Sequence, residues 1–175
     1  MMRVFLGLGS NLAREKNICA GLAALKDLFG ELIISPVYES ESVGFKGSHF
    51  YNLVVSANTN LTLIQLSEAL KKIEDENGRV RTGPKFGPRT LDIDILTYGD
   101  FVGVEAGIEL PRAEITQNAF VLLPLSEIAP DEIHPQLQKT YAELWANYDK
   151  TSQSLWVINL STPATKPGLP QALST

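Results

Sequence analysis

The sequence contains little cysteine or histidine and no long apolar run. Its one cysteine, Cys19, excludes an internal disulfide and a thiolate metal site, and we expect it to be a small core residue. The two histidines, His49 and His134, are far apart and do not have the spacing of metal ligands, so we expect both in loops or on the surface. No apolar segment reaches membrane-spanning length, and no secretory signal is evident. We therefore expect a cytoplasmic protein that does not bind membranes.

Basic residues are in the minority, with 15 lysines and arginines against 20 aspartates and glutamates and a net charge of −5. Such a surface repels nucleic acid, and no alternation of exposed aromatic and basic residues is present, so nucleic acid is not an expected partner. Four basic residues nevertheless lie in one acid-free segment, Arg79, Arg81, Lys85 and Arg89. A local positive patch in an acidic protein suits a small anionic ligand, whereas the alternative is a solvated basic loop.

The length of 175 residues, with 44% hydrophobic and 20% charged residues, is typical of one globular domain with a substantial core. We expect a single domain over residues 1–160. Residues 161–175 are rich in proline, serine, threonine and alanine, and are expected to form a flexible tail.

The hydrophobic pattern predicts strands and helices in alternation. A capping-box pair, Thr62 and Gln65, predicts a helix start, and Pro36 restricts its strand to a sheet edge or a bulge. We expect strands at 4–8, 32–40, 50–58, 90–98 and 155–160, helices at 14–29, 62–78 and 140–148, a hairpin near 101–110, and an irregular or helical stretch up to residue 125.

The order β-α-β-β-α-β over the first hundred residues indicates a ferredoxin-like α+β fold with a C-terminal extension. It predicts a mainly antiparallel, four-stranded sheet with helices on one face. We expect the first and last strands of this unit to be central neighbours, which would place the strand 90–98 mid-sheet, within reach of Phe50 and Asn52.

The strand 90–98 carries two aspartates, Asp92 and Asp94, on the same face, roughly 6–7 Å apart along it. Like charges on one face repel, and a hard divalent cation offsets the repulsion. Mg²⁺ is held by one or two carboxylates together with phosphate oxygens, and Arg89 just ahead could hold such a phosphate. The alternative is a solvated strand face with two incidental acids, but the Gly-Pro turn and Arg89 favour the metal–phosphate interpretation.

The run Phe86-Gly-Pro-Arg-Thr-Leu-Asp-Ile-Asp-Ile95 resembles the signature of the 6-hydroxymethyl-7,8-dihydropterin pyrophosphokinases of folate synthesis. The resemblance extends from Gly9–Leu12 to Glu127–Pro130. It implies transfer of the β,γ-pyrophosphoryl group of ATP to the hydroxymethyl oxygen of the pterin, with release of AMP. It also implies ATP as co-substrate, two Mg²⁺ ions and a monomer whose partners are these small molecules. Whether Asp94 or a metal-bound water takes the hydroxyl proton stays open.

The resemblance also assigns roles to individual residues. The aspartates would hold the two metal ions, two aromatic rings would stack on the pterin, and one amide would bind its edge. The catalytic set is Asp92, Asp94, Arg79 and Arg89. The nucleotide set is Glu74, Arg81, Lys85 and Ile95, to which we add Arg112 as a hypothesis. The pterin set is Ser40, Val43, Phe50, Asn52, Phe86 and Phe120, with Phe50 and Phe120 stacking and Asn52 at the edge. Taken singly, phenylalanines such as Phe50 and Phe120 are more often core residues, and Glu74 fits an ordinary exposed helix position equally well.

Three positions depart from the family pattern. Arg112 stands where histidine is common, Asn118 where a basic residue is usual, and Ser42 where proline is usual. We expect retained chemistry with altered nucleotide contacts, in which Arg112 takes over a phosphate-binding role. Two alternatives stay open, another two-metal nucleotidyl or phosphoryl transferase and a non-catalytic paralogue that binds nucleotide or pterin.

Overall fold

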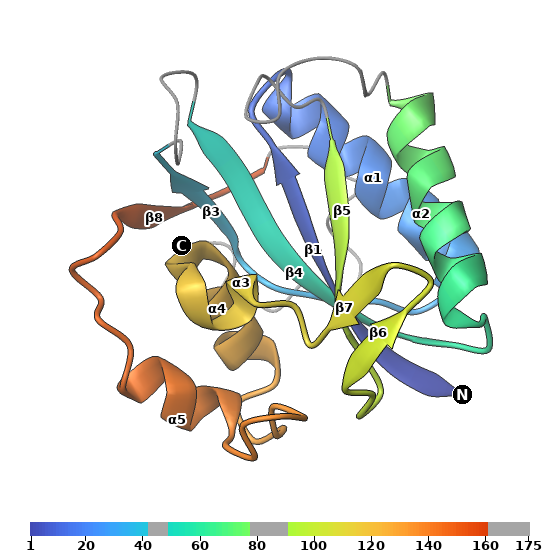
Figure 1. Cartoon of the computed structure of the whole chain (residues 1–175). Helices are drawn as coiled ribbons and strands as arrows, with labels where there is room; N and C mark the ends of the chain where they lie inside the picture. Colours follow the sequence, from blue (N-terminus) through green and yellow to red (C-terminus); the bar gives the residue numbers. More distant parts are fainter. Residues whose placement is uncertain (42–48, 78–90, 161–175) are drawn as a thin grey trace.

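The computed structural model describes residues 1–41, 49–77 and 91–160 (Figure 1). Its strands are β1 (Met2–Ser10), β2 (Ile33–Ile34), β3 (Val37–Ser40), β4 (Phe50–Thr59), β5 (Asp92–Tyr98), β6 (Gly103–Glu105), β7 (Ile108–Leu110) and β8 (Leu155–Ile158). One antiparallel sheet has the order β5-β1-β4-β3-β8, with β2 also paired to β4, and β6 and β7 form the expected hairpin. The expected α+β class with a mainly antiparallel sheet is confirmed.

The helices are α1 (Arg14–Phe29), α2 (Leu63–Glu76), α3 (Glu114–Gln117), α4 (Ala119–Ile128) and α5 (Tyr141–Ala146). The bounds of α1 agree with the prediction, and α2 begins at the predicted capping box of Thr62 and Gln65. A second capping box, Thr140 with Glu143, begins α5. Within the described residues, no helix combines the length and the apolarity needed to cross a membrane.

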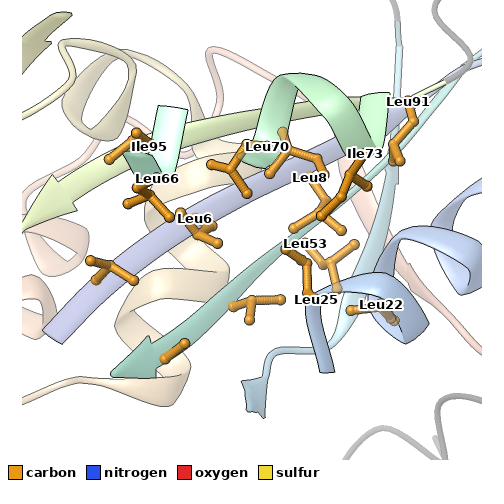
Figure 2. Packing of buried hydrophobic residues seen from close by; sticks show 14 of the residues in the cluster. Leu6, Leu8, Leu22, Leu25, Leu53, Leu66, Leu70, Ile73, Leu91 and Ile95 are labelled. Carbon is orange, nitrogen blue, oxygen red and sulfur yellow. The ribbon is translucent and has the colours of Figure 1, made fainter. Parts of the chain in front are cut away.

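One face of the sheet packs against α1 and α2 and forms the first core cluster (Figure 2). Alternate residues of β1, such as Leu6 and Leu8, point to this side and are at most 2% exposed. The apolar stripes of the two helices meet them with Leu22, Leu25, Leu66, Leu70 and Ile73. The stripes predicted from helical spacing therefore form the main core.

The opposite face of the sheet is also covered by helices, so the expectation of helices on one face only was wrong. Phe5, Val54 and Leu96 point to this side and pack against α3, α4 and α5 in the second core cluster. The helix α4 is apolar on most of its surface and contains Pro124, so it lacks the one-sided period that marks a surface helix. This explains why the sequence pattern weakened over these residues.

The strand β5 lies at an edge of the described sheet and not mid-sheet as expected. It pairs with β1 only, because β4 occupies the other side of β1. The two strands are neighbours as predicted, but β1 alone is central. Consequently, β1 lies between β5 and β4 and separates them by the width of one strand.

The predicted strand 32–40 is interrupted at Ser35 and Pro36, which separate β2 from β3. Ser35 repairs the interruption, since its hydroxyl accepts a hydrogen bond from the amide of Val54 at 2.9 Å and its own amide donates to the Val54 carbonyl at 2.9 Å. The bulge predicted from Pro36 is thus present, and both halves still pair with β4.

The two histidines differ in their surroundings. His134 lies outside the helices and strands, as expected, but is buried at 4% exposure, and its Nδ1 accepts hydrogen bonds from the amides of Gln136 and Leu137. His49 lies outside the strands as expected and contacts Glu39 through Nδ1 at 3.1 Å. Cys19 is buried, as predicted.

Candidate functional site

A row of three residues, Asp92, Gly9 and Asn52, crosses three neighbouring strands, and its two polar side chains lie on the α4 face of the sheet. Asp92 of β5 pairs in register with Gly9 of β1, and Gly9 pairs on its other side with Asn52 of β4. Ile93 and Ile95 point into the first core cluster, so Asp92 and Asp94 project to the opposite face. The structure therefore brings both acids and the amide to one face.

Gly9 creates the space that the Asn52 side chain occupies. A β-carbon at position 9 would lie 2.8 Å from Oδ1 of Asn52 and 3.8 Å from the ring of Phe50. The Asn52 amide is 8% exposed, and its Nδ2 donates to the hydroxyl of the buried Ser40 at 3.3 Å. Gly9 and Ser40 thus set the orientation of the buried Asn52 amide. Its oxygen lies over β1, the strand between Asn52 and Asp92.

Two aromatic side chains border this face. Phe50 lies two residues before Asn52 on β4, and Phe120 is the second residue of α4, which packs against β4. Both rings are only partly buried, and Phe120 rests against the second core cluster. Neither ring is a fully enclosed core side chain, so both keep surface for a ligand.

The contact between α4 and the sheet includes a partly buried polar pair. The hydroxyl of Tyr38, which pairs in register with Asn52, donates to the carboxylate of Glu127 on α4. Burial, together with the Glu127 carboxylate, raises the pKa of Tyr38, which therefore remains a donor at neutral pH. Burial also raises the pKa of Glu127, while the hydrogen bond from Tyr38 opposes that rise. This pair anchors the helix that carries Phe120 to β3.

Arg112 reaches the same face from the segment after β7. Its amide donates to the Leu96 carbonyl of β5 at 2.9 Å, and its Nη2 lies 3.5 Å from Oδ1 of Asp94. A cationic side chain is therefore held beside the aspartates at a position that departs from the family pattern.

Two of the expected nucleotide residues have side chains on the other face. The side chain of Ile95 is in the first core cluster, so only its backbone is available to a ligand. Glu74 is 7% exposed, which contradicts an ordinary exposed position, and its Oε2 accepts a hydrogen bond from the Ile93 amide at 2.7 Å. Glu74 on α2 thus fixes the backbone of β5 through the Ile93 amide.

The remaining expected site residues lie outside the described residues. These are Val43, Arg79, Arg81, Lys85, Phe86 and Arg89, together with Ser42, the basic loop and the tail at 161–175.

The donor set at the aspartates fits a magnesium ion that is shared with a substrate. Within the described parts of the chain, no group of three or more histidine, cysteine, aspartate or glutamate side chains could enclose a metal. Mg²⁺, however, keeps several waters and is usually bound by one or two carboxylates plus phosphate oxygens. Asp92 and Asp94 supply two such hard oxygen ligands on one face, so the residues present fit this ion.

Sequence reasoning missed two residues of the site. Gly9 lies within β1, beyond the predicted strand end at residue 8, and the pattern Gly7-Leu8-Gly9 on a strand signals two bare positions on one face. Gln153 carries no such signal. Its Oε1 accepts from the Ala119 amide at 2.8 Å and its Nε2 donates to Oδ1 of Asn118 at 3.1 Å, which ties the start of α4 to the C-terminal extension.

Comparison with known proteins gives consistent matches. The family model for 7,8-dihydro-6-hydroxymethylpterin-pyrophosphokinase matches residues 5–130. A 2-amino-4-hydroxy-6-hydroxymethyldihydropteridine pyrophosphokinase from Aquifex aeolicus is 39% identical over 145 residues, which are 82% of this chain and 90% of that protein. The Pseudomonas aeruginosa protein of the same name is 40% identical over 135 residues, 75% of this chain and 83% of that one.

Solved structures agree on the fold. The wild-type Plasmodium falciparum HPPK-DHPS with pteroate is similar over 83% of this chain with a TM-score of 0.66 and 16% sequence identity. The match covers 44% of that longer chain, so this chain spans less than half of its length. At this identity the likeness concerns the fold alone, whereas the family model and the two bacterial relatives carry the assignment. The chain therefore belongs to the 7,8-dihydro-6-hydroxymethylpterin-pyrophosphokinase family and is an ATP-dependent pyrophosphokinase.

Proposed function

We propose that this enzyme transfers the β,γ-pyrophosphoryl group of ATP to the hydroxymethyl oxygen of 6-hydroxymethyl-7,8-dihydropterin in folate biosynthesis. In this step the pterin oxygen forms a bond to the β-phosphorus, the bond from that phosphorus to the α,β-bridging oxygen breaks, and AMP leaves with the bridging oxygen. The hydroxyl proton is released as the new bond forms. The names of the bacterial relatives support the substrate class.

The observation that carries the proposal is the row of Asp92, Gly9 and Asn52 on one face of the sheet. It places acidic residues suited to a metal–phosphate group at one end and an oriented amide at the other. Transfer of a phosphoryl-type group depends mainly on positioning and charge neutralisation, so a rigid sheet with both binding chemistries on one face suits the reaction.

The acceptor end of the row supplies the contacts that a pterin needs. The Asn52 amide is the hydrogen-bonding group for the polar edge of the ring system, and Phe50 and Phe120 are the stacking residues for its faces. The Ser40 hydroxyl orients the Asn52 amide, and in this proposal the backbone at Ser40 contacts the pterin. Val43 and Phe86 complete this set in our proposal.

The other end of the row binds the nucleotide. Asp92 and Asp94 are the ligands for two Mg²⁺ ions, which when bound would neutralise charge on the phosphate oxygens. In this proposal Arg112 contacts the phosphates and Ile95 contributes through its backbone, while Glu74 accepts a hydrogen bond from the Ile93 amide of β5. In the proposal, Arg79, Arg81, Lys85 and Arg89 add phosphate contacts from the basic loop.

The decisive experiment is phosphorus NMR on the purified chain with MgATP and 6-hydroxymethyl-7,8-dihydropterin. We expect AMP and a pterin diphosphate, and loss of turnover in Asp92→Asn and Asp94→Asn. Asp100→Asn is the matched control, because Asp100 is an exposed acid in the turn just after β5. Formation of ADP, or full activity in both aspartate variants, would overturn the proposal.

A further inference from the structure

Arg112 is shared between two carboxylates. Its Nε donates to Oε2 of Glu114 at 3.2 Å, while its Nη2 lies 3.5 Å from Oδ1 of Asp94. The side chains of Arg112, Asp94 and Glu114 are 34%, 47% and 40% exposed, respectively. Partly exposed ion pairs contribute little to folding stability, so this arrangement calls for a reason other than stability.

The backbone of Arg112 is fixed at an irregularity of the strand that carries the aspartates. In the register against β1, Phe5 pairs with Thr97 and Leu6 with Ile95, so β5 has one extra residue, Leu96. The Leu96 carbonyl accepts the hydrogen bond from the Arg112 amide, and the Arg112 carbonyl accepts one from Ile115 at 3.2 Å. The bulge thus holds the Arg112 backbone beside the metal-ligand strand while its guanidinium remains partly exposed.

We propose that Arg112 is a counter-cation of Asp94 and competes with the divalent metal for this carboxylate. The inference rests on the proposed function in one respect, namely that the metal binds at Asp92 and Asp94. The Arg112 guanidinium thus places a positive charge beside the Asp94 carboxylate. A dication at the aspartates shares the Asp94 charge and repels the guanidinium, which weakens the contact between Arg112 and Asp94.

The same competition couples the metal to the nucleotide. Glu114 holds the Nε side of the guanidinium, so the Nη groups can leave Asp94 while the side chain stays in the site. Phosphate oxygens are bidentate acceptors for these groups, and a bound triphosphate would draw them away from Asp94. Removing the competing cation strengthens metal binding, and by reciprocity the metal strengthens nucleotide binding. Metal and nucleotide would therefore bind cooperatively, with Arg112 as the positioning residue that links them.

Metal affinity without nucleotide tests the proposal without reference to turnover. Mn²⁺ binding to the full chain, measured by electron paramagnetic resonance, should be about two- to fivefold tighter in Arg112→Gln than in the wild type, the size expected for an exposed ion pair. Arg3→Gln is the matched control. Arg3 pairs with Glu132 at 2.8 Å and its side chain is 35% exposed. Arg3→Gln removes the same charge as Arg112→Gln, but at a position far along β1 from the aspartates. The Mn²⁺ affinity of Arg3→Gln should therefore equal that of the wild type.

A second titration uses a non-hydrolysable ATP analogue with Mn²⁺. The wild type should show a larger gain in Mn²⁺ affinity on adding the analogue than Arg112→Gln does. Unchanged or weaker Mn²⁺ binding by nucleotide-free Arg112→Gln would overturn the inference, as would an equal gain in the two proteins. Asp94→Asn separates this failure from that of the proposed function. If Asp94→Asn leaves Mn²⁺ affinity unchanged, the metal assignment itself fails, whereas loss of Mn²⁺ binding in Asp94→Asn with no effect of Arg112→Gln rejects the competition alone.

Discussion

The side-chain oxygen of Asn52 lies over the backbone of Gly9, 2.8 Å from the place where a β-carbon at position 9 would stand. A methyl group at that position would push the amide away from the orientation that Ser40 supports. The contact involves the end of a side chain, so a shift is cheap for folding but moves the group that we assign to the pterin edge.

We therefore expect Gly9→Ala to weaken pterin binding about tenfold, equivalent to ~1.4 kcal/mol, while the urea midpoint stays close to that of the wild type. Pterin titration by fluorescence and urea unfolding measure the two effects. Gly7→Ala is the control on the same face, because its β-carbon would lie 3.5 Å from Leu96, an ordinary contact. Equal pterin affinity in Gly9→Ala and the wild type would contradict the role given to Asn52.

Glu74 is expected to be important for stability. Replacing it by alanine leaves the buried Ile93 amide without its acceptor, which should lower the free energy of unfolding by about 1–3 kcal/mol. Glu74→Gln keeps an acceptor oxygen and should lose less. Urea denaturation measures both variants, with Glu68→Ala, an exposed glutamate on the same helix, as control. If Glu74→Ala is as stable as Glu68→Ala, the supporting role is wrong.

Phe120 is expected to contribute to pterin affinity more than to folding. Phe120→Leu keeps an apolar contact with the second core cluster but removes the flat ring, which should weaken pterin binding by about 0.5–1.5 kcal/mol. Isothermal titration with the pterin gives the affinity. The control is Phe29→Leu, since Phe29 is a partly buried phenylalanine packed against the first core cluster on the other face. Similar losses of affinity in both variants would argue against stacking at Phe120.

His134 should make stability depend on pH. Burial lowers its pKa below the usual 6.5, and its Nδ1 accepts two backbone hydrogen bonds that only the neutral ring can accept. The unfolded chain therefore takes up a proton at a higher pH than the folded chain, so stability is complete above about pH 6.5 and falls as the pH drops below it.

The measurement is urea unfolding between pH 8 and pH 5 for the wild type and His134→Gln. The variant should lose less stability than the wild type over this interval, and His49→Gln controls for the only other histidine. Parallel pH profiles of stability for the wild type and His134→Gln would show that protonation of His134 is not coupled to unfolding, and would contradict the prediction.

Local patterns predicted the elements well, because each depends on neighbours in the sequence. The α1 stripe ending at Phe29 and the capping box at Thr62 and Gln65 are complete within a few residues, and the structure confirms both. The positions of Asp92 and Asp94 on one face likewise follow from strand alternation alone.

The errors concern relations between distant parts of the chain. Which side of β1 receives β5 depends on where β4 pairs, and no local period encodes that choice. The contact of Gln153 with Asn118 joins residues more than thirty positions apart, so no local pattern signals it. The need for glycine at position 9 follows only from the pairing of β1 with β4, which brings the Asn52 side chain over it.

The two core clusters on opposite faces of one sheet have an evolutionary consequence. The first cluster holds α1 and α2 to the sheet, while the segment with Arg112 and Asn118 rests on the opposite face. A lineage can therefore exchange residues at these two positions without disturbing the contacts of α1 and α2 with the sheet. Under the proposed function, inhibitors aimed at this segment would discriminate between lineages better than those aimed at the row from Asp92 to Asn52.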